Sequence, residues 1–232
     1  ERFAKEGSSV VVAEINEAAG QETVDLITDA GGISSFLPLD VTDIHSVKAM
    51  VEHTVKRYGA IDILVNNAAA FPMGSVEDAT EDEWIHVMRT NVIGSANCIK
   101  EVTPIFRKSG GGSIINIASV SGFMAEPEAV PYNASKGAVM QLTRCTAMDL
   151  ADDHIRVNGV CPGQIDTAGA TQVIIDRGLD VVEADKERAA EALMKRMGRP
   201  EEIASVILFL ASEDASFMTG AHIVVDGGQT ID

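Results

Sequence analysis

Tyr132 and Lys136 stand four residues apart in the run Pro131–Gly137, and Ser119 lies thirteen residues before the tyrosine, at the end of an apolar run. Residues four apart project from the same face of an α-helix, so the lysine ammonium would lie close to the phenol. A nearby cation favours the phenolate and lowers the tyrosine pKa towards the range where it exchanges protons near neutral pH. A serine hydroxyl from a neighbouring strand end could hold a carbonyl or alcohol oxygen against that phenol. The three residues predict a proton-transfer site for carbonyl and alcohol chemistry.

The pair alone is a weak signal, because tyrosine and lysine at this spacing arise by chance on many amphipathic helices. A lone serine after a strand is most often a helix cap or a turn residue. The interpretation therefore depends on the elements that position these three side chains.

Apolar strand patterns alternate with helical patterns along the whole chain. Strands are expected at 10–13, 36–39, 61–65, 113–118, 155–160 and 222–225, and helices at 1–6, 17–30, 43–58, 132–150 and 200–211. A further helix opens on the capping box Thr80–Glu83. Strands without polar alternation, separated by helices, predict a single α/β domain with a doubly wound parallel sheet covered on both faces.

In such sheets, ligands bind beyond the carboxyl ends of the strands. The distinctive residues of this chain follow five predicted strands: Glu14, Asp40, Asn66-Asn67-Ala68, Ser119 and Pro162-Gly163. Their common position predicts that the function lies along one edge of the sheet.

Composition excludes several other classes of function. The 232 residues carry a net charge of −17 without a basic cluster, which argues against nucleic acid or an anionic membrane surface as a partner. No apolar run is long enough to span a membrane. The three cysteines and five histidines show no ligand spacing, so we expect no catalytic metal. Reduced thiols and no visible secretory signal favour the cytoplasm.

Several ordered motifs then carry a resemblance to one family. Asn66–Ala69 is similar to an Asn-Asn-Ala-Gly element, with Ala69 in place of the glycine, and Asn91 in Thr90–Gly94 joins Ser119, Tyr132 and Lys136 as a tetrad. Three further segments, 162–167, 198–203 and 219–228, resemble a nicotinamide-holding segment and two C-terminal signatures. On these motifs the chain resembles the classical short-chain dehydrogenase/reductase family from residue 1 to its C-terminus.

The resemblance implies a Rossmann-like sheet of about seven strands that binds NAD(H) or NADP(H). It implies that Tyr132 is the general acid/base and that Lys136 lowers its pKa and binds the nicotinamide ribose. Ser119 would orient and polarise the substrate oxygen, and Asn91 would hold a water that relays protons. It further implies a homotetramer, with helices around 84–100 and 132–150 at the interfaces.

Glu14 bears on the choice of cofactor. A carboxylate at this strand end can accept hydrogen bonds from both adenosine ribose hydroxyls and would repel a 2′-phosphate. Ile15 and Asn16 supply no cation to attract that phosphate, so the sequence favours NAD over NADP. The resemblance implies further cofactor contacts from Ile15, Asp40, Val41, Asn67, Ala68, Ala69, Tyr132, Lys136, Pro162, Gly163, Ile165 and Thr167.

The sequence departs from the family at its N-terminus. The family opens with a strand and a Thr-Gly-x-x-x-Gly-x-Gly loop that holds the pyrophosphate, and no such segment is found here. Gly110–Gly112 is no substitute, because it precedes a strand instead of joining a strand to a helix. We interpret the sequence as an N-terminally incomplete record of a complete enzyme.

Two alternatives stay open beside an NAD-dependent oxidoreductase acting on secondary alcohols and ketones. One is a cofactor-free relative of the halohydrin dehalogenase type, although that group has arginine in place of Lys136. The other is a non-catalytic homologue, against which the tetrad argues. Residues 167–196 are expected to form a substrate lid, and no particular substrate follows from the sequence. Candidates to line its pocket are Phe71, Met73, Phe123, Met124 and Glu126.

Overall fold

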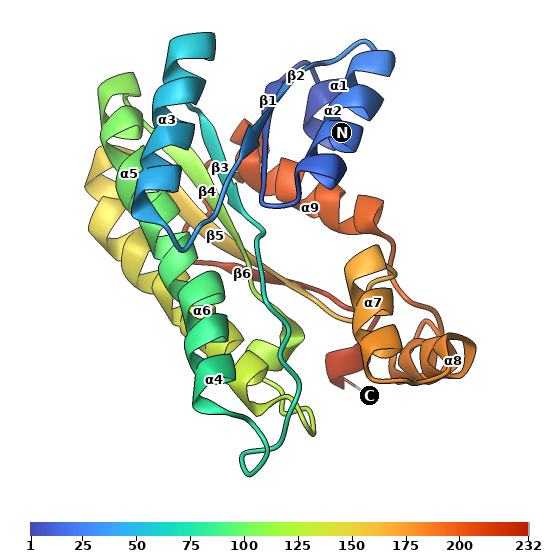
Figure 1. Ribbon diagram of the computed structural model, residues 1–232. Helices are drawn as coiled ribbons and strands as arrows, with labels where there is room; N and C mark the ends of the chain where they lie inside the picture. Colours follow the sequence, from blue (N-terminus) through green and yellow to red (C-terminus); the bar gives the residue numbers. More distant parts are fainter. Residues whose placement is uncertain (232) are drawn as a thin grey trace.

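The computed structural model describes residues 1–231 and contains two parallel sheets in this range (Figure 1). Strand β1 (Ser9–Glu14) pairs with β2 (Ile33–Pro38). The second sheet has the order β3-β4-β5-β6, from β3 (Ile63–Asn66), β4 (Gly112–Ile117), β5 (Ile155–Pro162) and β6 (His222–Val225). Strands β4 and β5 each have a hydrogen-bonded neighbour on both sides, so they are the inner strands of this sheet.

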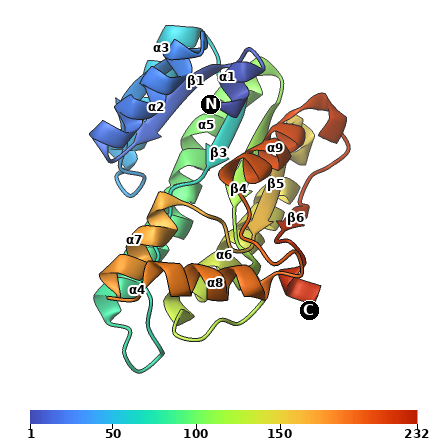
Figure 2. The ribbon, with the colours of Figure 1, turned by 90° about the vertical axis from the view of Figure 1, so that its right-hand side faces the viewer.

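Helices separate the strands along the chain. They are α1 (Arg2–Lys5), α2 (Glu17–Asp29), α3 (Ile44–Tyr58), α4 (Glu81–Val87), α5 (Ser95–Ser109), α6 (Val130–Leu150), α7 (Ala168–Asp176), α8 (Val181–Glu191) and α9 (Pro200–Ala211). A π-helical segment, η1 (Met88–Gly94), joins α4 to α5 without a break, and a short 3-10 turn, η2 (Val120–Gly122), follows β4. Helices α3, α5 and α6 lie on one side of the four-stranded sheet and α9 on the other (Figures 1 and 2).

Alternating side chains of β4 supply the two halves of the core. Ile114 belongs to a buried cluster with Phe106 of α5 and Leu150 of α6, whereas its neighbour Ile115 packs with Leu210 of α9. Successive strand residues point to opposite faces of a sheet, so an unbroken apolar run serves both layers. This explains why the strands show no polar alternation.

The expected α/β architecture with parallel strands is confirmed, and the predicted strands appear within about three residues of their expected bounds. Residues 1–231 hold six strands in two sheets, compared with the sheet of about seven strands that the family resemblance implies. A continuous sheet requires a backbone ladder between neighbours, and β1 and β3 share none. No helix in the described range is long and apolar enough to cross a membrane.

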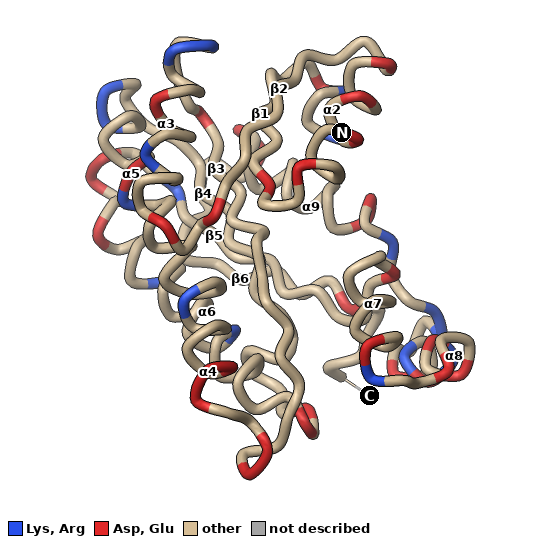
Figure 3. Tube along the Cα trace, viewed as in Figure 1, with Lys and Arg blue, Asp and Glu red and all other residues tan. Residues whose placement is uncertain are grey.

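Local sequence signals determine several helix ends. Thr80 and Glu83 form the predicted capping box at the start of α4, with reciprocal hydrogen bonds of 2.8 and 3.2 Å. Gly110 ends α5 in a left-handed conformation just before β4, which confirms that the Gly110–Gly112 run is a helix-to-strand turn. Acidic residues are dispersed over the helices and are not gathered on one face (Figure 3).

Phe106 provides a test of this core. Its side chain is fully buried beneath β4, so Phe106→Ala should lower the free energy of unfolding by about 3–5 kcal/mol. Phe217 is the matched control, because it is fully exposed and Phe217→Ala removes no internal packing. Urea titrations of both variants measure the difference, and equal losses would contradict this assignment of the core.

Candidate active site

Ser119 lies two residues beyond the end of β4. Its backbone is extended, with φ −169° and ψ 160°, and its hydroxyl accepts a hydrogen bond from the backbone N–H of Ser121 at 3.2 Å. The serine therefore begins the η2 turn, as a capping residue would, and is itself only 8% exposed. Its position between β4 and the following turn presents the hydroxyl to helix α6.

Tyr132 and Lys136 lie in the first two turns of α6, which has Pro131 near its start. Lys136 is 3% exposed, and its Nζ donates a hydrogen bond of 2.8 Å to the carbonyl oxygen of Ile117, the last residue of β4. The same Nζ lies 5.6 Å from the centroid of the Tyr132 ring. The predicted helical pair is thus present, and its cation is anchored to the end of the central strand.

A glycine permits the close contact between the serine turn and the helix. A Cβ on Gly122 would lie 2.7 Å from the sulfur of Met140 and 3.0 Å from the carbonyl oxygen of Lys136. Any larger residue would push η2 away from α6. The turn that begins at Ser119 therefore packs directly against the helix that carries Tyr132.

Burial dominates the titration of the site. It raises the pKa of Tyr132 above its ordinary value of 10; the nearby Ser119 hydroxyl lowers that pKa and the charge of Glu126 raises it. Burial also lowers the pKa of Lys136 to about 8. The tyrosine pKa was expected to fall below its ordinary value, but it lies above it, because the loss of solvation on burial is the largest effect on both groups.

Asn91 lies in the π-helical segment η1 and is buried. Its amide accepts from the backbone N–H of Ala70 at 2.7 Å and donates to the Ala70 carbonyl at 3.0 Å and to the Ser135 hydroxyl at 2.9 Å. Ser135 in turn donates to the carbonyl of Tyr132 at 2.7 Å. The asparagine side chain thereby ties the loop after β3 to the helix that carries the tyrosine.

Three residues near the tyrosine complete this region. The Phe71 ring stacks on Tyr132 at 5.0 Å between centroids. Phe71 is one of the candidates to line the substrate pocket, and the stacking places it beside the tyrosine. Ser121 and Ser135 were not singled out from the sequence, since small polar residues near a strand end or within a helix carry no distinctive pattern. The spacing Ser119-Val-Ser121 was the only available signal for the former.

The residues expected to contact the adenosine half of a cofactor follow β1 and β2. Glu14 ends β1, and one of its carboxylate oxygens accepts from the backbone N–H of Asn16 at 2.9 Å. Asp40 follows β2 and accepts from Thr42 at 2.8 Å, while the carbonyl of Val41 accepts from Asn97 of α5 at 3.0 Å. A Cβ on Gly94 would lie 2.5 Å from Val41, so this segment rests directly on the helix that carries Asn91.

The other residues expected to contact the cofactor follow β1, β3 and β5. Asn67 and Ala68 are exposed just after β3, Ala69 is partly covered, and Ile15 is 69% exposed after β1. Pro162 ends β5, and Ile165 forms a bridge with Gly198. Thr167 accepts from Ala170 at 3.2 Å and caps α7, the first helix of the predicted lid. Arg188 of α8 fastens that lid through a 2.9 Å bond to the Ile165 carbonyl.

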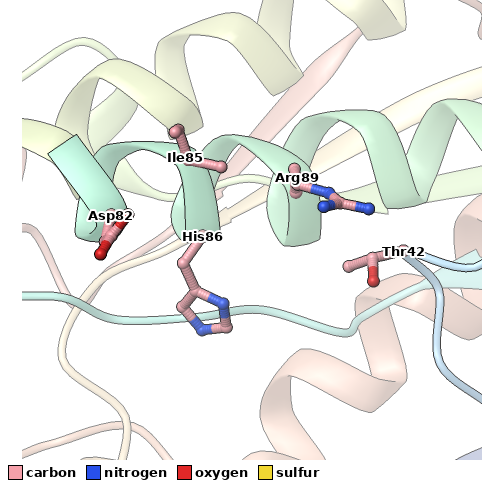
Figure 4. A pocket seen from close by; sticks show the side chains of 5 residues that line it. All are labelled: Thr42, Asp82, Ile85, His86 and Arg89. Atoms are coloured by element: carbon pink, nitrogen blue, oxygen red, sulfur yellow. The ribbon is translucent and has the colours of Figure 1, made fainter.

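A separate pocket lies against α4 and η1 (Figure 4). Its lining consists of Thr42, Asp82, Ile85, His86 and Arg89. It contains none of the tetrad residues, so it is not the proton-transfer site.

Comparisons with known proteins agree with this geometry. A family model described as enoyl-(acyl carrier protein) reductase matches residues 1–230. An uncharacterized oxidoreductase of Thermotoga maritima is 40% identical over 99% of this chain and 89% of its own length. The trans-4-hydroxycyclohexanecarboxylate dehydrogenase of Sinomonas cyclohexanicum is 39% identical over 98% of this chain and 85% of its own length.

Solved structures show the same likeness. A short-chain dehydrogenase/reductase from Burkholderia xenovorans superposes with a TM-score of 0.96 and 37% identity, covering all of this chain and 88% of that one. An actinorhodin polyketide ketoreductase variant with NADPH has a TM-score of 0.95 and 31% identity, covering 100% and 91%. An NAD⁺-bound xylitol dehydrogenase has a TM-score of 0.92 and 30% identity, covering 98% and 91%. The chain belongs to the short-chain dehydrogenase/reductase family of oxidoreductases.

The buried lysine generates a prediction about stability. Because its pKa is about 8 instead of 10.5, the unfolded chain binds more protons between these values, and the cost of the buried charge is fully present below pH 8. Lys136→Met should therefore raise the free energy of unfolding by about 1–3 kcal/mol at pH 7 while abolishing any turnover. The gain should shrink as pH rises from 8 towards 10.5. Denaturant titrations across this range measure it, and a gain independent of pH would contradict the buried-charge account.

Proposed function

We propose that the protein is an NAD-dependent oxidoreductase that interconverts a secondary alcohol and its ketone, with Tyr132 as general acid/base. The observation that carries this proposal is that the Tyr132 phenol lies beside the Ser119 hydroxyl, with the buried Lys136 ammonium 5.6 Å from the centroid of its ring. When bound, NAD would supply the redox chemistry by accepting a hydride from the alcohol carbon or returning it to the ketone. The protein then has to move one proton.

Each residue of the site has a role that its surroundings support. In alcohol oxidation, Tyr132 as phenolate takes the hydroxyl proton, and in ketone reduction the neutral phenol returns it. The Lys136 ammonium, held near the ring, stabilises the negative charge on the phenolate. Ser119 positions the substrate oxygen. Asn91 keeps η1, the Ala70 loop and α6 in register through its three hydrogen bonds, and we retain it as the site of a relayed water.

Aromatic side chains near the site and the names of two relatives support a cyclic alcohol as the substrate. Phe71 stacks on the Tyr132 ring. Phe123 directly follows the η2 turn in the sequence and is half exposed. A relative named for a hydroxycyclohexanecarboxylate and another named as a cyclopentanol dehydrogenase support a cyclic secondary alcohol as the first substrates to test.

For the cofactor, Glu14 supports NAD over NADP. Glu14 is partly exposed at the end of β1, and the next two residues, Ile15 and Asn16, supply no cation that would attract a 2′-phosphate. Similar structures carry either NAD⁺ or NADPH, so membership of the family does not determine the cofactor.

We further propose that the protein is a homotetramer. The helices that the family uses as interfaces carry exposed apolar side chains, namely Ile85, Ile93 and Met148. Sedimentation equilibrium of the purified protein measures the assembly.

The proton-transfer role predicts the behaviour of Tyr132→Phe in the full-length protein. The variant should bind NAD as the wild type does, because the aromatic ring and its stacking remain, but turnover of cyclopentanol, cyclohexanol or xylitol should fall by at least about 100-fold. Steady-state rates and NAD titrations are the measurements. Normal rates in this variant would refute the assignment of Tyr132.

The cofactor assignment predicts the behaviour of Glu14→Ala. Loss of the carboxylate removes both a ribose acceptor and the repulsion of a 2′-phosphate, so the ratio of kcat/KM with NAD⁺ to that with NADP⁺ should fall by about tenfold or more. Glu17→Ala is the matched control, because Glu17 is exposed in the first turn of α2 and carries the same charge. An unchanged ratio in the Glu14 variant would remove this residue as the determinant.

A further inference from the structure

A chain of hydrogen bonds leads from the proposed catalytic serine to a carboxylate. The Ser119 hydroxyl and the Ser121 hydroxyl are 3.0 Å apart, and the Ser121 hydroxyl lies 3.0 Å from Oε1 of Glu126. Both serines are buried and Glu126 is partly buried. None of the roles proposed above uses Ser121 or Glu126.

The charge of Glu126 determines the direction of these bonds. An ionised carboxylate only accepts hydrogen bonds, so Ser121 must donate its single hydroxyl proton to Glu126. Ser121 then has no proton left for Ser119, which must donate to Ser121. One lone pair of Ser119 accepts from the backbone N–H of Ser121, and the other is left to accept from the hydroxyl of an alcohol substrate.

The loop that carries Glu126 does not need this carboxylate to hold its shape. The backbone carbonyl of Glu126 accepts from the side chain of Asn133 at 3.2 Å. The residues that follow pair with Gly74 through backbone groups. The Gly74 carbonyl accepts from the N–H of Val130 at 3.2 Å, and the Gly74 N–H donates to the backbone carbonyl of Glu128 at 2.6 Å. With the loop held by its backbone, the Glu126 side chain is available to act on the serines.

We propose that Glu126, acting through Ser121, is a positioning residue that orients the Ser119 hydroxyl at the proton-transfer site. This inference rests on the proposed function of the same site. Charge-assisted hydrogen bonds are the stronger ones and are well suited to hold a hydroxyl in one rotamer. The same carboxylate charge also raises the pKa of Tyr132, so Glu126 acts on both partners of the substrate oxygen.

Several titratable groups near Tyr132 can contribute to the pH dependence of the rate. From α6 the Lys136 ammonium faces the ring, and from β5 the Cys161 thiol faces Lys136, its own pKa raised by burial to about 11. From the loop before α6, Glu126 faces the phenol, whereas Glu128 pairs outward with Arg177 of α7 at 2.7 Å. Glu128 therefore offers a matched control with the same charge two residues away.

Two variants separate the hydrogen bond from the charge. Ser121→Ala breaks the chain but keeps the carboxylate, so kcat for the alcohol that the wild type oxidises fastest should fall by about tenfold, with little change in KM. Glu126→Gln keeps an acceptor for Ser121 but removes the charge. It should retain most of kcat and move the acidic limb of the pH–rate profile to lower pH, because the tyrosine ionises more readily.

Glu126→Ala, which removes both, should show the loss of kcat and the shifted limb together, and Glu128→Gln should leave the limb in place. Wild-type kcat in Ser121→Ala and Glu126→Ala, or an unmoved limb in Glu126→Gln, would overturn the inference. Circular dichroism and thermal unfolding of each variant identify a loss of kcat that comes from misfolding. If Ser121→Ala or Glu126→Ala misfolds, the pH–rate profile of Glu126→Gln decides, because glutamine has nearly the same shape as glutamate. If no alcohol is oxidised by the wild type, or if Tyr132→Phe keeps its rate, it is the proposed function that fails.

Discussion

The buried ammonium of Lys136 is the interaction on which the site depends. A nearly inaccessible cation is costly, and within residues 1–231 it is the carbonyl of Ile117, at the end of β4, that accepts its hydrogen bond at 2.8 Å. The bond joins the first turns of α6 to the central strand. It leaves the charge 5.6 Å from the Tyr132 ring, close enough to stabilise a phenolate and too weakly paired to keep its own pKa at the ordinary value.

The surrounding fold keeps this arrangement in place. Asn66 of β3 donates to Asn116 of β4 at 2.8 Å, and Asn116 donates to Thr143 of α6 at 2.9 Å, so a buried polar network runs from two strands to the helix. Fully satisfied networks of this kind favour one packing over its alternatives. On the other side of the site, Asn91 binds the Ala70 loop and Ser135. Strand ends and helix are thereby held together before any ligand binds.

Much of this could be predicted from the amino-acid pattern. Apolar runs and caps determined the helices and most strands, and the order of motifs pointed to the tetrad and the family. Local signals sufficed because caps and periodicity act within a few residues. The register of the strand pairs could not be predicted from such local signals, because it depends on which strands become neighbours. The pKa of Tyr132 was expected to fall, and burial instead raises it; a spacing of four residues indicates proximity but not solvation.

The sequence by itself determined which groups are available: a phenol and an ammonium one helical turn apart, a serine after a strand, and a carboxylate after another. Only the tertiary structure decided how they are connected. The glycine contact at Gly122, the anchoring of Lys136 on Ile117 and the chain from Ser119 through Ser121 to Glu126 all join parts of the molecule across packed surfaces. The physical reason is that hydrogen-bond direction and desolvation depend on every group within a few ångströms, and those neighbours come together only when the chain folds.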